Sequence, residues 1–238
     1  MNIKEEQIQV LDLTIDVVKK DIKNMHLAVY PPTGRIRIAS PKDLNDEAIR
    51  LFAISKIRWI KKHQKNFYEQ LRESPREYIN GESHYFNGTR YLLKVIDRYG
   101  KHEVKIKSKK YLELYVSPKA TIKSKEIVFT EWYRRHLKMV LPKLIKKWET
   151  KIGVKSNDWK IKKMRTKWGS CNTEKKNILL NLELAKKPQH CLEYVIVHEL
   201  IHLLERNHND NFKALLDKFM PNWKTYKREL DSLPVAYD

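Results

Sequence analysis

The sequence predicts an α+β fold, and three observations support that prediction. The first half of the chain mixes strand-like segments with one amphipathic helix. A long segment, residues 123–150, carries its apolar residues on one helical face. Two short strand-like segments and a helix that is apolar almost all round then follow. Strands and helices arranged in this way are typical of a mixed, layered domain with a small sheet.

The N-terminal half is predicted to open with a sheet and a helix. In residues 7–18 and 27–38, apolar and polar residues roughly alternate in β-branched segments, and Gly34 lies in the break between two strands. Asn45 is a suitable N-cap for the helix that follows, in which apolar residues recur at helical spacing as far as Pro75.

A hairpin and two further strands are predicted next. Asn87-Gly88 stands between two strand-like runs, and this dipeptide is a strong signal for a two-residue hairpin turn. Further strands fit residues 104–106 and 111–116. The candidate domain boundary lies close to Pro118. It separates an N-terminal strand-rich α+β region, 1–117, from a C-terminal domain, 118–238.

The C-terminal half is predicted to be mostly helical. The long helix ends at Gly153, and short strands follow near residues 159–164 and 177–184. Pro188 then begins an apolar helix, and Asn209 or Asp210 can cap the next one.

Composition limits the class of protein. The 238 residues are 41% hydrophobic, which is enough for a core, and only two are cysteines, which argues against a disulfide framework. The N-terminus has charges where a signal peptide would be apolar, and no stretch is long enough to span a bilayer. We therefore expect a soluble, cytoplasmic protein without a membrane partner.

The net charge of +20 favours acidic partners, so nucleic acid or a nucleotide is a candidate ligand. The lysines, however, are spread along the whole chain rather than gathered in one block, and this also fits an ordinary solvated surface.

The segment Tyr194–His208, YVIVHELIHLLERNH, places His198, Glu199 and His202 in the HExxH pattern of zinc hydrolases. On a helix, positions i and i+4 share one face, so both imidazoles can reach one metal ion. A catalytic zinc takes a third protein ligand, and His208 follows six residues after His202. His208 can reach the ion only if the helix stops first. We expect a chain reversal at residues 205–207, with Asn207 in the left-handed conformation.

Four segments together resemble the YgjP-like metallopeptidase family: KWGSC at 167–171, ILLNLEL at 178–184, VIVHELIHL at 195–203 and NHNDNF at 207–212. The C-terminal third also resembles the SprT-like proteases. The resemblance implies a minimal zincin-like core, made of a long helix, a small antiparallel sheet, the HExxH helix and a segment that returns the third ligand. It also implies a metal-dependent hydrolase, most often a peptidase.

The mechanism expected for such a site assigns a role to each residue. His198, His202 and His208 would hold Zn²⁺ or another divalent transition metal, and Glu199 would act as general base for a metal-activated water. An extended peptide substrate could pair with the sheet edge near residues 177–184.

The chain offers several residues around this centre. Candidates for stabilising the oxyanion are Arg165, Lys167 and Tyr226. We interpret Cys171 as a small packed thiol, and we exclude His190 as a partner of His198 because it lies two turns earlier on the same helix.

Three function classes remain open: a peptidase, a metal-dependent nucleotide phosphohydrolase (pyrophosphatase), and a nucleic-acid-associated protease of the SprT-like kind. No glycine-rich phosphate loop is present to favour the second.

Overall fold

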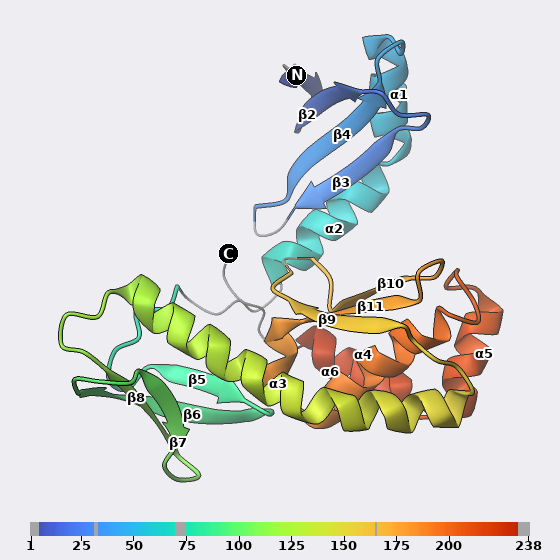
Figure 1. The fold of residues 1–238 in the computed structure, drawn as a ribbon. Helices are drawn as coiled ribbons and strands as arrows, with labels where there is room; N and C mark the ends of the chain where they lie inside the picture. The colour runs from blue at the N-terminus through green and yellow to red at the C-terminus, as the bar shows by residue number, and fades with distance from the viewer. Residues whose placement is uncertain (1–4, 31–32, 70–74, 165, 233–238) are drawn as a thin grey trace. The chain divides into compact units, whose positions relative to one another are not determined.

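The computed structural model describes residues 5–30, 33–69, 75–164 and 166–232. The chain forms two compact units that divide between residues 72 and 73. Figure 1 shows both units. The division lies well before the boundary that the sequence suggested near Pro118, because the strands just before Pro118 share a core with the long helix that follows it.

The first unit is a four-stranded sheet with two helices, and its sheet order is β1-β2-β4-β3. The strands are β1 (Glu5–Val10), β2 (Leu13–Lys20), β3 (His26–Tyr30) and β4 (Arg35–Pro41). The predicted alternation is confirmed in β4, where Ile36 and Ile38 are buried and the residue between them is more exposed. In β2 it does not hold, because residues 15–18 are all buried. This unit has its own apolar core, which Ile49 and Ile60 complete from the helices.

The helical segment of the first unit is two helices, α1 (Asp46–Ser55) and α2 (Ile57–Glu69), where the sequence predicted one. Asn45 caps α1 as predicted, because its side-chain oxygen accepts the backbone N–H of Ala48 at 2.9 Å. The break lies at Lys56, whose N–H bonds to the carbonyl of Ala53, so the chain turns tightly before α2 begins.

The second unit begins with another four-stranded sheet, in the order β5-β6-β8-β7. Its strands are β5 (Ser83–Phe86), β6 (Thr89–Asp97), β7 (Glu103–Ile106) and β8 (Tyr111–Val116). The predicted hairpin is confirmed: Asn87 and Gly88 have φ of 48° and 80° and join β5 to β6. Both residues of such a turn need positive φ, which Asn and Gly tolerate best.

The long helix α3 (Ile122–Ile152) runs through the second unit, from the sheet β5–β8 to the C-terminal helices (Figure 1). Thr121 caps its start and Gly153, at φ 81°, ends it as predicted. Near its start Phe129 and Trp132 pack with the sheet, and Trp132 contacts Phe86 at a ring distance of 4.5 Å.

A second, three-stranded sheet follows α3, in the order β10-β11-β9. Its strands are β9 (Asp158–Lys162), β10 (Gly169–Asn172) and β11 (Asn177–Asn181). The predicted strands near 159–164 and 177–184 are confirmed as β9 and β11, although residues 182–186 form a 3₁₀ turn, η1 (Leu182–Lys186). The sheet is mixed rather than wholly antiparallel, because β9 runs parallel to β11.

The prediction that the segment near 177–184 forms a free sheet edge is wrong. β11 is the central strand and pairs with β9 on one side and β10 on the other. The two edge strands are β9 and β10. The sequence did not indicate β10, since Gly169-Ser170-Cys171-Asn172 shows neither strand-like alternation nor β-branched residues.

Three helices complete the fold: α4 (Gln189–Ile201), α5 (Asp210–Phe219) and α6 (Trp223–Ser232). α4 starts after Pro188, as predicted, and is buried on most sides. The elements of the predicted α+β core are therefore present: the long helix, the small sheet and the apolar helix with its following segment. Within the described part of the chain, we find no helix with both the length and the apolarity needed to cross a membrane.

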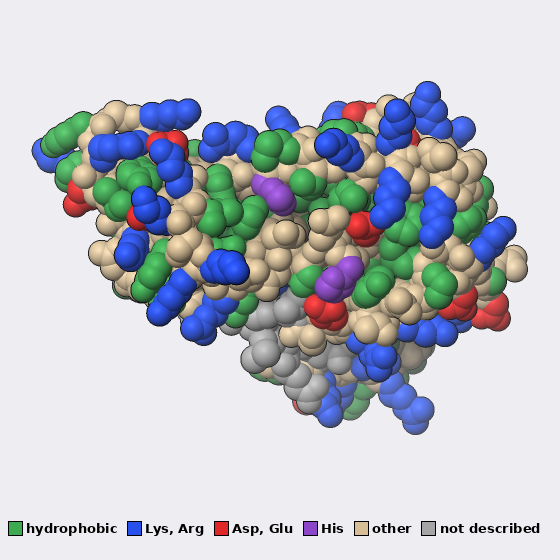
Figure 2. All heavy atoms as spheres, turned by 90° about the horizontal axis from the view of Figure 1, so that it is seen from below, with side chains coloured by type: hydrophobic (Ala, Val, Ile, Leu, Met, Phe, Trp, Pro, Cys, Tyr) green, Lys and Arg blue, Asp and Glu red, His purple; other side chains and the backbone are tan. Residues whose placement is uncertain are grey.

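The charge of +20 is spread widely over the surface. Figure 2 shows one face, on which Lys and Arg side chains recur across the surface and Asp and Glu side chains are sparse.

The β5–β6 turn is docked on the segment that leads into α4, which gives a testable consequence. The N–H groups of Asn87 and Gly88 bond to carbonyls of η1, and a methyl group added at Gly88 would lie 2.7 Å from Pro188 Cγ. We expect Gly88→Ala to cost about 1–2 kcal/mol for positive φ and about 1–3 kcal/mol more for overpacking, measured by urea unfolding.

Gly81→Ala is the matched control, because Gly81 has φ 84° but nothing within 4 Å of the added methyl group. Equal losses in the two variants would contradict the docking of the turn on Pro188.

Candidate metal centre

The helix that carries the HExxH residues is held in place by α3. Glu193 of α4 accepts hydrogen bonds from Lys147 Nζ at 2.7 Å and from Trp148 Nε1 at 2.8 Å. Beyond this contact, α4 presents a continuous apolar surface to the core, in which Val197 and Leu200 are fully buried. Rotation of α4 would break both the hydrogen bonds and the packing, so the direction in which its histidines project is fixed.

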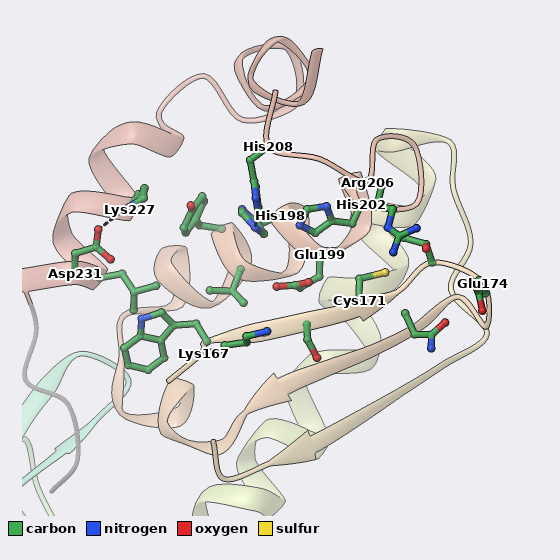
Figure 3. Close-up of a pocket in the computed structure, with 18 residues that line it drawn as sticks. Lys167, Cys171, Glu174, His198, Glu199, His202, Arg206, His208, Lys227 and Asp231 are labelled. Carbon is green, nitrogen blue, oxygen red and sulfur yellow. Dashed lines mark hydrogen bonds and ion pairs between the residues drawn. The ribbon is translucent and has the colours of Figure 1, made fainter. Parts of the chain in front are cut away.

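The structure brings the three predicted histidines together. The ring nitrogens Nε2 of His198 and His208 lie 3.0 Å apart, and one ring nitrogen from each of His198, His202 and His208 lies within 4.8 Å of the others. Figure 3 shows the three rings converging at the end of α4. Two nitrogens bound to one tetrahedral zinc at about 2.1 Å would lie about 3.4 Å apart, so the observed set fits such an ion. That they bind a metal stays a prediction.

His202 shows which of its nitrogens faces the centre. Its Nδ1 lies 3.1 Å from the carbonyl oxygen of Glu205, so it donates its proton there, and Nε2 is left as the basic nitrogen. A ligating histidine commonly has its other N–H fixed by a carbonyl in this way.

The chain reversal that returns His208 begins earlier than predicted. α4 ends at Ile201, and the N–H groups of Leu203 and Leu204 bond to carbonyls three residues back. This tight turn makes the reversal without a left-handed residue. Asn207 does not have a positive φ, so the prediction that it adopts the left-handed conformation is wrong.

After the reversal, Asn209 is the N-cap of α5, and its side-chain oxygen accepts the N–H of Phe212 at 3.0 Å. Asn209 was one of the two N-cap residues that the sequence predicted for this helix.

Phe212 supports the three histidines, a role that the sequence analysis missed. Its ring is buried, and its centre lies 4.9, 4.7 and 4.8 Å from the rings of His198, His202 and His208. The N-cap at Asn209 fixes the first turn of α5 and therefore the position of Phe212. A signal was present in the sequence, because Phe212 is the first large apolar residue after His208.

Burial sets the protonation of the centre. Burial, with the neighbouring His202 and His208 next in effect, lowers the pKa of His198 to about 3. Burial also lowers the pKa of His202. Both rings are therefore neutral near pH 7, which is the form that can bind a metal.

Glu199 lies in an equally dry position. Burial raises the pKa of Glu199 to about 8, and the nearby positive charge of Lys167 opposes that rise. A divalent cation beside this carboxyl group would add a second positive charge and favour its ionised form.

Strand β10 lies against Glu199 without any side chain between them. A methyl group added at Gly169 would lie 2.5 Å from Glu199 Oε1 and 2.8 Å from its Cγ. Glycine is therefore required for the strand backbone to approach the carboxylate this closely. Cys171 follows on the same strand beside Glu199 and His202 (Figure 3), and burial raises its pKa to about 11. This fits a packed, protonated thiol.

Asn181 fixes the chain that leads into β10, another role that the sequence did not reveal. It is buried, and its side-chain nitrogen donates to the carbonyls of Met164 at 2.7 Å and Lys167 at 2.8 Å. Its backbone N–H bonds to the carbonyl of Trp168 at 2.9 Å. These bonds hold Met164, Lys167 and Trp168 against the end of β11, so the position of Gly169 depends on them.

The histidines and Glu199 open into a cavity of about 640 Å³. β10 forms one wall. The lining carries basic side chains, Lys167, Arg206 and Lys227, and acidic ones, Glu174, Glu199 and Asp231. Lys227 pairs with Asp231 within α6 (Figure 3).

Of the two oxyanion candidates that the structure describes, Lys167 is in the lining. Arg165 lies outside the described residues. Tyr226 packs on His190, at a ring distance of 4.9 Å, and does not line the cavity.

His190 is not part of the histidine trio, in agreement with its exclusion. Its Nε2 lies 2.6 Å from Glu229 Oε2, and it groups with Cys191 and Glu229 instead. This contact ties α4 to α6.

A buried HExxH helix, a third histidine returned by a turn and a carboxylate facing a cavity define the class of site, which is that of a metal-dependent hydrolase. The chain belongs to the YgjP-like family, because the family's description "YgjP-like, metallopeptidase domain" matches residues 23–233. The family resemblance predicted from the sequence is therefore confirmed, and a metal-dependent peptidase is its general class. A search of curated proteins gives no match.

Two solved structures are similar to part of the chain. One is the metallopeptidase zymogen abylysin of Pyrococcus abyssi, at 17% identity and a TM-score of 0.36, covering 38% of this chain and 91% of that one. The other is the metallopeptidase zymogen jannalysin of Methanocaldococcus jannaschii, at 22% identity and a TM-score of 0.34, covering 37% of this chain and 91% of that one. TM-scores this low support no further inference about this chain.

The close approach of β10 to Glu199 predicts the effect of a small substitution. Gly169→Ala should displace the Glu199 carboxylate and reduce hydrolytic activity about tenfold or more, since a misplacement of about 1 Å can cost a hundredfold. Metal content, measured by elemental analysis, should stay as in the unchanged protein because no histidine moves.

Ser170→Ala is the control, since it changes the same strand without adding an atom. If Gly169→Ala left hydrolytic activity unchanged, the close approach of β10 would not determine the position of the Glu199 carboxylate.

Proposed function

We propose that this protein is a zinc metallopeptidase in which His198, His202 and His208 hold the ion and Glu199 is the general base. The observation that carries the proposal is the convergence of three imidazoles beside a buried carboxylate in one cavity. Three imidazole ligands suit zinc, and they also accept nickel, cobalt or copper. When bound, such an ion would polarise a water molecule and lower its pKa towards neutrality.

Glu199 has the position for the proton transfers. Its ionised carboxylate would take a proton from the attacking water, whose oxygen forms a bond to the carbonyl carbon of the substrate. When the carbon–nitrogen bond breaks, Glu199 would give that proton to the leaving amine. The dry surroundings that raise its pKa to about 8 also make it an effective acid in this second step.

Strand β10 is the segment against which an extended peptide would lie. It is an edge strand of its sheet, so one row of its backbone groups pairs with no other described strand, and its residues line the cavity beside Glu199. Backbone pairing of this kind is largely blind to sequence. It replaces the pairing with residues 177–184 that the sequence suggested.

A second candidate function is suggested by the basic side chains of the cavity. Lys167, Arg206 and Lys227 line it, and cations of this kind also stabilise phosphate groups, as a nucleotide phosphohydrolase would require. The two functions make different demands on the same centre, so parallel assays with casein and with nucleoside triphosphates separate them.

Removal of the third histidine tests the metal set. His208→Ala should lower the affinity for Zn²⁺ at least tenfold, because one of three protein ligands is lost, while the fold is kept since His208 is exposed. Competition with a chromophoric chelator measures the affinity.

His26→Ala, in the first unit, is the matched control for the loss of an exposed histidine. If zinc affinity were unchanged by His208→Ala, His208 would not be a ligand.

Substitution of the general base tests the mechanism. Glu199→Gln should retain zinc and lower casein hydrolysis by about 10²–10⁴-fold, the range expected for the loss of general acid–base catalysis. Glu174→Gln, a change of the same kind elsewhere in the cavity lining, should have little effect. Full activity in the Glu199 variant would refute its role. Nucleotide hydrolysis that depends on Glu199, with no peptide cleavage, would favour the second candidate.

A further inference from the structure

The outer face of the sheet β5–β8 carries tyrosine rings together with basic side chains. Side chains alternate between the two faces of a strand. On β8, Leu112, Leu114 and Val116 are fully buried in the core beneath α3. Tyr111 and Tyr115 therefore lie on the opposite face.

The neighbouring strands place cations around these two rings. In the sheet register, Leu92 and Lys94 of β6 lie opposite Tyr111 and Glu113, and Lys105 of β7 lies opposite Glu113. Lys94 Nζ lies 4.2 Å from the centre of the Tyr111 ring. Lys105 Nζ lies 5.2 Å from the centre of the Tyr115 ring.

The ends of the strands add more positive charge. Arg98, after β6, lies 4.4 Å from the centre of Tyr115. Lys110 lies 5.6 Å from that of Tyr111, at the end of the β7–β8 turn, which also carries exposed Lys107 and Lys109. Figure 2 shows this part of the molecule on the left, where hydrophobic and basic side chains are interleaved and acidic ones are few.

The acidic residues of this face neutralise one end of it only. Glu103 pairs with Arg98 at 2.9 Å and with Lys105 at 3.0 Å, and Glu113 accepts the hydroxyl of Tyr115 at 2.6 Å. Lys94 and Lys110, which flank Tyr111, make no ion pair within the described part of the chain. The end of the face around Tyr111 therefore has both an aromatic ring and uncompensated positive charge.

We propose that this face binds single-stranded nucleic acid, with bases stacking on Tyr111 and Tyr115 and the lysines contacting phosphates. Aromatic rings on a sheet surface beside cations are the features that recognise unpaired bases and the phosphate backbone together.

The spacing of the rings favours a single strand over a duplex. Tyr111 and Tyr115 are four residues apart on one strand, a separation of about 13 Å. Bases in a duplex are stacked about 3.4 Å apart and their faces are covered by neighbours, so they cannot stack on two separate rings. A single strand with splayed bases can do so.

The proposal is independent of the metal centre, because none of these residues lines the cavity of the histidines. Its test is binding, which needs neither a metal nor peptidase activity. Fluorescence anisotropy with a labelled oligothymidine of about 20 nucleotides, measured at several salt concentrations on the full chain, gives the affinity and the salt slope.

We expect the single strand to bind at least tenfold more tightly than a duplex of the same length. Tyr111→Leu, which keeps an apolar strand residue but removes the ring, should weaken binding about fivefold or more, and Tyr111→Phe should retain it. The pair Lys94→Gln and Lys110→Gln should reduce the salt slope by about 1.4, since each lost phosphate contact contributes about 0.7.

Matched controls lie elsewhere on the chain. Tyr68→Leu removes a tyrosine that is 77% exposed on α2, and the pair Lys143→Gln and Lys146→Gln removes exposed charges from α3. Thermal unfolding verifies that each variant is folded.

Two outcomes would overturn the proposal. One is the absence of binding at low salt. The other is equal binding of single strand, duplex and heparin with no effect of Tyr111→Leu. The surface would then attract any polyanion by its positive charge and would not recognise unpaired bases.

Discussion

The convergence of three imidazole rings at the end of a buried helix is the constraint on which the C-terminal half of this fold depends. Burial makes a charged imidazole costly, and the pKa of His198 falls to about 3 in consequence. The second unit therefore holds neutral nitrogen donors together in an apolar setting. The Nε2 atoms of His198 and His208 lie 3.0 Å apart, a spacing that suits two ligands of one divalent cation.

Several elements that share no sequence motif serve this arrangement. α3 clamps α4 through Glu193, α5 carries Phe212 beneath all three rings, and Asn181 holds the entry to β10. The backbone of β10 in turn lies directly against the Glu199 side chain at Gly169. Each contact restricts the position of a group at the centre, so the geometry is a property of the whole unit rather than of the HExxH helix alone.

The parts of the fold that the sequence predicted are those with strong local signals. The alternation in β4, the caps at Asn45 and Asn209, the Asn87-Gly88 turn and the helical face of α3 all depend on neighbouring residues, and all are confirmed. The spacing of His198 and His202 on one helical face is local in the same sense.

Features that depend on tertiary contacts could not be predicted in this way. The edge position of β10 follows from pairing with β11, and no residue of the GSCN segment indicates it. The 72/73 division depends on which residues share a core, and the roles of Phe212 and Asn181 depend on what lies next to them. The reversal before His208 is made by a tight turn at the end of α4, and Asn207 does not adopt the left-handed conformation that its residue type suggested.

X-ray absorption spectroscopy of the zinc-loaded protein tests the central claim most directly, because it reports which atoms surround the ion. The structure predicts three imidazole nitrogens at about 2.0–2.1 Å and one further light ligand, with no sulfur in the first coordination sphere. A sulfur at about 2.3 Å, which would implicate Cys171 or Cys191, or a shell of oxygens with fewer than three imidazoles, would contradict it.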